Sequence, residues 1–181
     1  LAGEAYYFRA WYYYGLLVNY GPVSIVEKPL NPDAEEMQAY SKRNSRTEVA
    51  DFIINDLKTA VANLQEKNNS ATMRIHRDVA RALLSEVALF EGTWEKYHKG
   101  QKFADPACTD AKVKEYLQTA ADAAKAVIDR GVWKIYSTGD ALNDYRVLFA
   151  TTDLGSNSEV LWYKKYAGDL VGNNVDRYLN T

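Results

Sequence analysis

Cysteine and histidine are scarce in this sequence of 181 residues, and neither sign of charge is in large excess. Cys108 is the only cysteine, so an internal disulfide is impossible, and no Cys/His cluster has the spacing of a zinc or redox site. The net charge of −2 gives no broad positive field, which makes nucleic acid and anionic membrane surfaces poor partners. We therefore expect no metal, no other cofactor and no nucleic-acid partner.

A catalytic constellation is also missing. His76 and His98 stand apart without an adjacent carboxylate or cysteine pattern, and there is no glycine-rich phosphate loop. Paired acids such as Glu35 and Glu36 fit a solvated helix face, although two carboxylates about 5–10 Å apart would suffice for a glycosidase. The sequence predicts a protein that is not an enzyme, and a helical carbohydrate-active enzyme is the least favoured alternative.

The sequence has no long run free of polar residues. Its main apolar stretch, Glu4–Tyr20, contains eight aromatic residues, but its two charges, one Asn and six tyrosines argue against a membrane span. At 100° per residue its apolar side chains surround the helix, a pattern typical of a helix buried on all sides. We expect this helix to be the hub of a helical scaffold, with the aromatics from Tyr6 to Tyr14, and also Trp94 and Trp162, in the core.

Three further long helices follow from spacing and capping signals. Ser45-Arg46-Thr47-Glu48 is a capping box that opens an amphipathic helix ending near Leu64. Apolar residues at helical spacing predict helices over Arg77–Tyr97 and Asp110–Arg130. Gly21-Pro22 stops the first helix, and the long loop that follows includes a possible helical turn at Ala34–Gln38.

The end of the chain has a different character. The alternation of residue types at Val132–Tyr136 predicts a short strand. We expect a helical turn at Leu142–Phe149 and a buried extended segment at Glu159–Tyr163. The predicted fold class is mostly α, a tetratricopeptide-like scaffold of helical pairs with long loops and a little extended structure. We expect residues 1–165 to form this helical core and residues 166–181 to begin a truncated ligand-loop region.

The tetratricopeptide pattern is degenerate. In the first helical pair it comprises Tyr6, Ala10 and Tyr13 followed by Ile53, Leu57 and Ala60, and in the second pair Leu84, Ala88, Ala120, Ala124 and Val127. The connecting loops exceed those of a regular repeat of about 34 residues. Ordinary amphipathic helices packed antiparallel explain the spacing almost as well.

Four blocks, in order, resemble one family, the SusD/RagB outer-membrane nutrient-binding lipoproteins. The blocks are Glu4–Tyr13, Ser45–Ala60, Ala80–Trp94 and Ser158–Trp162. The resemblance covers residues 1 to about 165. It departs from the family at Gly21–Ile25, where the family usually places proline after the hydrophobic residue, so this loop is expected to have its own geometry.

The resemblance implies an internal fragment of a longer protein, without the lipid anchor expected before Leu1 and the large region expected after Thr181. It implies non-catalytic capture of a glycan or other nutrient at the cell surface, on the outer membrane. It also implies delivery to a SusC-like TonB-dependent transporter as partner. The alternative from the residues alone is a tetratricopeptide-like interaction module that binds a partner peptide.

Candidate ligand residues are those that no helical or strand period explains. Sugar rings stack their C–H faces on aromatic rings, and sugar hydroxyls need polar partners, so a loop that mixes both kinds of side chain is the best candidate. The set is Tyr166, Asn173, Asn174, Arg177 and Tyr178. The sequence does not identify the sugar.

Overall fold

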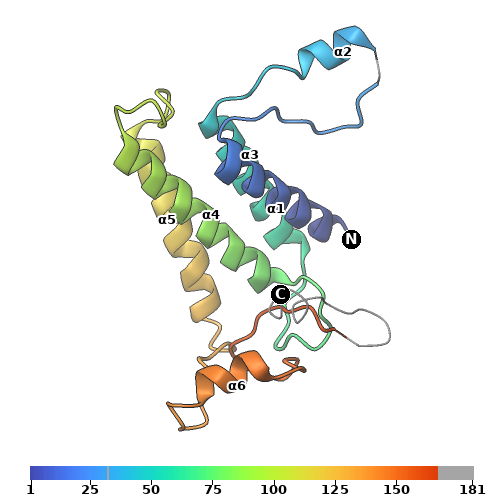
Figure 1. The fold of residues 1–181 in the computed structure, drawn as a ribbon, viewed down its shortest axis with the longest axis vertical. Coiled ribbons are helices and arrows are strands. Elements are labelled where there is room, and N and C mark those ends of the chain that lie inside the picture. Colours follow the sequence, from blue (N-terminus) through green and yellow to red (C-terminus); the bar gives the residue numbers. More distant parts are fainter. Residues whose placement is uncertain (32, 167–181) are drawn as a thin grey trace, which may run out of the picture. The chain divides into compact units, whose positions relative to one another are not determined.

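The computed structural model describes residues 1–31 and 33–166, and within these ranges it contains helices and no strand (Figure 1). The helices are α1 (Ala2–Tyr20), α2 (Ala34–Ala39), α3 (Arg46–Asn63), α4 (Arg77–His98), α5 (Asp110–Ile128) and α6 (Asp144–Ala150). The predicted mostly-α fold is confirmed. The described residues form two compact units: unit 1 contains 1–66 and 76–129, and unit 2 contains 67–75 and 130–166.

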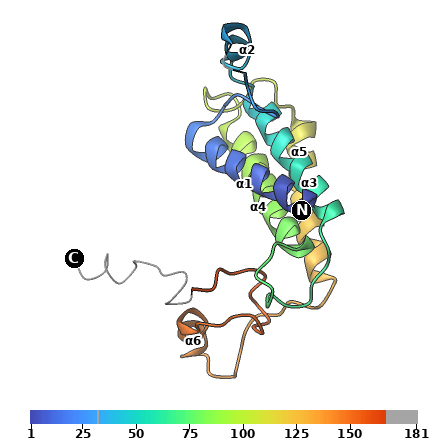
Figure 2. The same cartoon turned by 90° about the vertical axis from the view of Figure 1, so that its right-hand side faces the viewer.

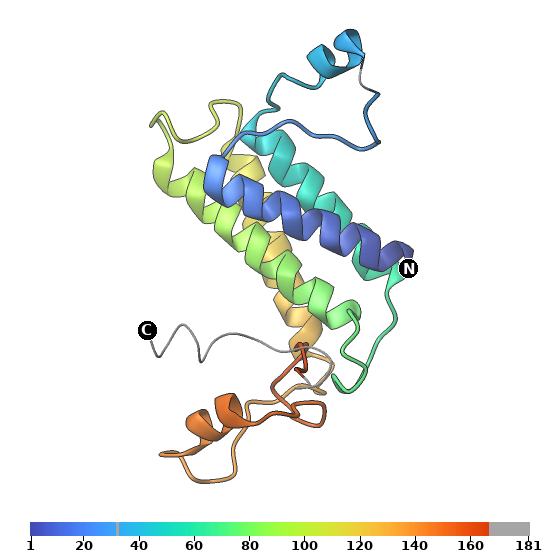
Figure 3. The same cartoon turned by 45° about the vertical axis from the view of Figure 1, so that its right-hand side comes forward.

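Unit 1 is a row of four long helices. α1 packs on α3, α3 on α4 and α4 on α5, and each runs antiparallel to the one before it (Figure 3). In the turned view α1 lies across α4, with α3 beside it (Figure 2), and the Tyr14 ring of α1 meets Phe90 of α4 edge to face at 5.8 Å. The two helical pairs that the sequence predicts therefore share one core, with Tyr7, Leu17, Ile53, Leu57 and Val87 among its fully buried side chains.

The local signals at helix ends operate as predicted. The backbone N–H of Ser45 donates to the Glu48 carboxylate at 2.7 Å, and the Glu48 N–H donates to the Ser45 hydroxyl at 3.3 Å, which completes the capping box of α3. Gly21 ends α1 with a φ of 67°, a left-handed conformation that glycine adopts without steric cost.

Gly92 lets α4 and α5 approach closely. A Cβ at this position would lie 2.9 Å from Leu117 Cδ2 and 3.2 Å from the Tyr116 Cβ. Sequence considerations alone treat this glycine as a weak point of the helix. The structure shows that the missing side chain is needed for packing.

The prediction that α1 is buried on all sides is wrong for the described structure. Gly3, Tyr7, Ala10 and Leu17 form its buried face. The rest of the helix surface exposes large apolar side chains, namely Phe8, Trp11, Tyr12, Leu16 and Val18. α3 makes most of the contacts with α1, and α4 adds the Tyr14–Phe90 ring contact, so the described helices leave the other sides of α1 uncovered.

Polar contacts also join α1 to its neighbours. The Arg9 guanidinium donates to both oxygens of Asp56 at 2.6 and 2.7 Å, a bidentate pair between α1 and α3. The Tyr13 ring meets Phe52 edge to face at 5.0 Å, and its hydroxyl accepts the backbone N–H of Val26 at 2.7 Å. Tyr13 therefore anchors both α3 and the start of the long loop.

Unit 2 contains α6 and extended segments, and residues 132–136 do not form the short strand predicted. The backbone N–H of Lys134 donates to the Ser158 carbonyl at 2.9 Å, and the N–H of Tyr136 donates to the Glu159 carboxylate at 2.7 Å. One backbone bond is not a ladder, so no strand forms in the described residues. The segment 159–163 is half-buried at most, and the Trp162 indole donates to the Met73 carbonyl, so Trp162 is not the core residue predicted.

Candidate binding site

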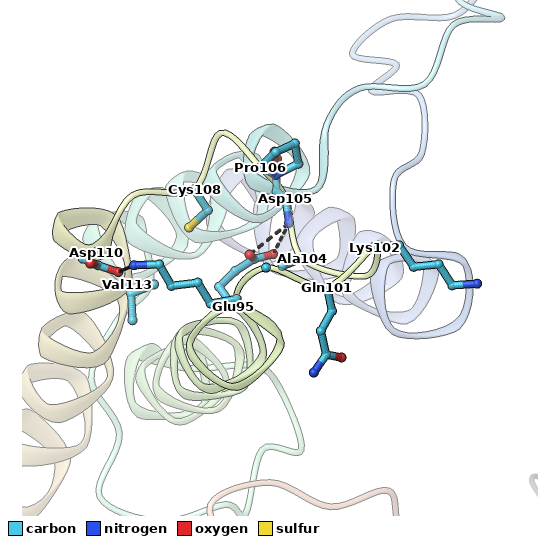
Figure 4. Close-up of a pocket in the computed structure, with 11 residues that line it drawn as sticks. Glu95, Gln101, Lys102, Ala104, Asp105, Pro106, Cys108, Asp110 and Val113 are labelled. Atoms are coloured by element: carbon cyan, nitrogen blue, oxygen red, sulfur yellow. Dashed lines mark hydrogen bonds and ion pairs between the residues drawn. The ribbon is translucent and has the colours of Figure 1, made fainter.

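The α4–α5 loop, residues 99–109, lies at the same end of unit 1 as the C-terminal end of α1 (Figure 3). Two hollows border this loop. A groove of about 590 Å³ separates the loop from the end of α1, and a pocket of about 580 Å³ lies between the loop and the facing ends of α4 and α5 (Figure 4). Both hollows are lined by Lys102, Ala104, Asp105 and Pro106.

A buried ion pair underlies the site. Arg46 donates to the two oxygens of Glu91 through Nε at 3.0 Å and Nη2 at 2.8 Å, and Glu95 lies 3.6 Å from Nε. Arg46 is 5% exposed and Glu91 is fully buried. The two residues are 45 positions apart in sequence, and the pair joins the first turn of α3 to the C-terminal half of α4.

The loop is fixed to this network by Asp105. Its backbone N–H donates to both oxygens of Glu95 at 3.2 and 3.0 Å (Figure 4). Its carboxylate accepts the N–H groups of Thr47 and Ala107, each at 2.9 Å. The loop is thereby tied to α4 and to the N-terminus of α3.

Burial governs the protonation of these acids. It raises the pKa of Glu91 to about 7 in spite of the Arg46 guanidinium, and it also raises the pKa of Glu95. Burial opposes ionisation of Asp105 as well, but hydrogen bonds from the backbone N–H groups of Thr47 and Ala107 bring its pKa below the usual value. Near neutral pH Glu91 is therefore partly protonated, whereas Asp105 is ionised.

Cys108 lies in the wall of the pocket beside Glu95. Burial, together with the negative charge of Glu95, raises the pKa of its thiol. A thiol that stays protonated is a poor nucleophile and a poor metal ligand. The pocket therefore has no activated cysteine.

Aromatic rings line the groove. Trp94 is held in place because its indole N–H donates to the Phe103 carbonyl at 3.1 Å, His98 stacks on it at 4.2 Å, and the Arg46 guanidinium lies 4.4 Å from its ring centre. Tyr20 and Phe103 are 66% and 56% exposed. The groove therefore offers one fixed indole and two rings accessible to a ligand.

Residues 1–31 and 33–166 contain neither a cluster of metal-ligating side chains nor a membrane-spanning helix. No group of His, Cys, Asp or Glu side chains there is arranged to hold a metal ion. None of the helices in that part combines the length and apolarity needed to cross a bilayer.

The predicted ligand residues lie elsewhere. Tyr166, in unit 2, is 45% exposed, and the Lys164 ammonium lies 5.1 Å from its ring centre. Asn173, Asn174, Arg177 and Tyr178 lie outside the described residues, so their role stays a prediction.

Sequence reasoning missed the residues of the groove. Phe103 lies in a loop that no period explains, so the criterion that selected Tyr166 would also have selected it. Tyr20 is the last residue of α1, at the end of the apolar stretch for which the sequence predicts burial. Nothing in the sequence alone indicated that Arg46 would reach Glu91, because the contact joins separate helices.

Comparison with known proteins points to one family. Residues 1–89 match the SusD-like family described as "Starch-binding associating with outer membrane". No curated protein matches the sequence significantly.

Solved structures share the fold of nearly the whole chain. A SusD-like protein from Bacteroides fragilis matches with a TM-score of 0.66 and 24% identity, over 92% of this chain and 27% of its own. A SusD homolog from Bacteroides thetaiotaomicron matches with a TM-score of 0.59 and 20% identity, over 95% of this chain and 29% of its own. The chain thus spans less than a third of the length of these structures.

Proposed function

Since this chain is SusD-like in its first 89 residues and in its fold, we propose that it belongs to a non-catalytic protein that captures a glycan or other nutrient at the outer membrane. The observation on which the proposal rests is the family match, because the family is described by starch binding and by association with that membrane. The fold supports the family and does not by itself identify a ligand.

The geometry of unit 1 agrees with binding without bond chemistry. The acids that line the two hollows are Glu95, Asp105 and Asp110. Glu95 and Asp105 accept hydrogen bonds from backbone N–H groups, and Asp110 pairs with Lys99. The thiol of the neighbouring Cys108 has a raised pKa and is a poor nucleophile. Exposed aromatic rings and polar rims, the usual elements of sugar recognition, line the groove instead.

The remaining parts of the proposal follow from family membership. The captured nutrient would pass to a SusC-like TonB-dependent transporter, and a lipid anchor elsewhere in the protein would hold it at the cell surface. Tyr166, Asn173, Asn174, Arg177 and Tyr178 remain predicted ligand residues at the end of the chain.

The test is to titrate the whole protein with maltoheptaose and other neutral oligosaccharides by isothermal titration calorimetry, and to follow the same mixtures by chromatography. We expect saturable binding with the oligosaccharide recovered unchanged. Release of shorter products at a measurable turnover would overturn the proposal, and so would the absence of binding to every oligosaccharide tried.

A further inference from the structure

The groove between the end of α1 and the α4–α5 loop has the composition of a ligand site. Its walls include Tyr20, Pro22, Trp94, Phe103 and Pro106, and Arg46 forms part of its lining. We propose that this groove is a subsite for a neutral sugar ring, recognised by stacking on Tyr20 or Phe103 and by a hydrogen bond from Arg46. The inference rests on the proposed function, glycan capture, and adds a site that is separate from the predicted ligand residues.

The first step concerns a hydrogen-bond donor at the groove. The Nε and Nη2 atoms of Arg46 are held by Glu91, whereas Nη1 makes no hydrogen bond to any described residue. The side chain as a whole is 5% exposed and lines the groove. A buried guanidinium fixed on one side and open on the other presents its remaining N–H groups at little entropic cost.

Gly21 keeps the space beside that donor open. A Cβ added to Gly21 would have the Arg46 Nη1 at 3.9 Å as its nearest atom, with no other atom within 4 Å. The positive φ of Gly21 also disfavours any other residue here. The turn that ends α1 therefore leaves the guanidinium edge accessible from the groove.

The second step concerns the walls. Tyr20 and Phe103 come from separate elements, and more than half of each side chain is exposed. The apolar C–H face of a pyranose stacks on such rings. The volume of about 590 Å³ lies within the range of roughly 300–1,000 Å³ common for small-molecule sites.

The third step concerns the polar groups of the groove, which suit the hydroxyls of a sugar. The charged residues that line the groove are Arg46, Lys102 and Asp105, so the lining offers both N–H donors and a carboxylate acceptor. Sugar hydroxyls accept from Arg46 and donate to carboxylate oxygens, so an uncharged ring satisfies both.

The experiment compares Phe103→Ala and Tyr20→Ala with Tyr97→Ala in the whole protein. Tyr97 is a matched control because it is 70% exposed on α4 and does not line the groove. The probes are maltoheptaose, xylohexaose and mannohexaose as neutral chains and hexagalacturonate as an anionic one. Affinity is measured by calorimetry, and hydrogen exchange of residues 99–109 is measured with and without each probe.

We expect at least one neutral probe to bind and to slow exchange in residues 99–109. Phe103→Ala or Tyr20→Ala should weaken that binding about 3- to 10-fold, the range of a single ring contact, while Tyr97→Ala leaves it unchanged. The exchange measurement on the unaltered protein keeps the test valid if a variant folds poorly.

Other outcomes separate the two proposals. Binding of a neutral probe that is insensitive to Phe103 and Tyr20, with no protection of residues 99–109, would overturn the subsite and leave glycan capture intact. Binding of hexagalacturonate alone, weakened by these substitutions, would overturn the neutral ligand class. Absence of binding to all four probes would overturn glycan capture, and the subsite with it.

Discussion

At the scale of single residues, Arg46 has the largest influence on the site. It pairs with Glu91 through two hydrogen bonds, lies over Trp94 and lines the groove, so one side chain joins a buried ion pair to an accessible surface. A buried pair of this kind adds little net stability compared with apolar packing, but removing one partner leaves an uncompensated charge. We infer that the pair serves to position the guanidinium, not to strengthen the fold.

Glu91 should make stability depend on pH. Its pKa is raised from 4.5 unfolded to about 7 folded, so between these values the folded state binds more protons than the unfolded state. The free energy of unfolding should therefore fall as pH rises from about 5 to 8, by at most roughly 3 kcal/mol at ~1.4 kcal/mol per pKa unit. Glu95, also with a raised pKa, acts in the same direction.

Urea unfolding at pH 5, 6, 7 and 8 measures this slope. Glu91→Gln should reduce it, because glutamine does not titrate, although the variant is less stable overall. Glu35→Gln, at an exposed position, is the control and should leave the slope unchanged. An unaltered protein whose stability rises over this pH range would contradict the assignment.

At the scale of elements, packing between helices overrides helix propensity. Gly92 allows α4 and α5 to approach, whereas Gly15 in α1 has no atom within 4 Å of an added Cβ. The same residue type thus has a packing role in one helix and none in the other. Burial of α1 follows the same rule, because its neighbours and not its composition decide which aromatics are covered.

Gly92→Ala and Gly15→Ala should therefore have opposite effects. At Gly92 the contact with Leu117 should cost about 1–3 kcal/mol of overpacking, which exceeds the gain of roughly 1 kcal/mol in helix propensity. At Gly15 the propensity gain stands alone, and the variant should be more stable by about 0.5–1 kcal/mol. Urea denaturation of both variants measures the difference, and a stabilising Gly92→Ala would contradict the close approach.

At the scale of the whole molecule, scaffold and ligand contacts should separate. Tyr13 packs on Phe52 and holds the N–H of Val26, which makes it part of the scaffold of unit 1. Tyr178 lies in the stretch predicted to meet the ligand. Replacing each with alanine distinguishes the two roles.

Tyr13→Ala should lower the free energy of unfolding by several kcal/mol, in the ~3–5 kcal/mol range of large aromatic truncations, with unchanged affinity in the folded fraction. Tyr178→Ala should lower affinity for the oligosaccharide and leave stability nearly unchanged. Thermal unfolding and calorimetry on the same preparations measure both quantities. A Tyr13→Ala variant that is fully stable but unable to bind would reverse the assignment.

The sequence by itself determined the features that depend on neighbours along the chain. Capping at Ser45, the stop at Gly21 and the periods of the long helices are local, and the structure confirms them within a few residues. The family resemblance needed only the order of four blocks. The sequence also predicts extended segments near Trp133 and Val160. Whether such segments pair as strands depends on contacts between them, which neither segment determines alone.

Only the tertiary structure decided which surfaces exist. The exposed face of α1, the pair of Arg46 with Glu91 and the meeting of Tyr20 with Phe103 in one groove all join residues that are far apart in sequence. Periodicity predicts that a helix has an apolar face, but it does not indicate which other helix will cover that face. The packing of α1, α3 and α4 supplies that answer, because contact across helices depends on their arrangement in space.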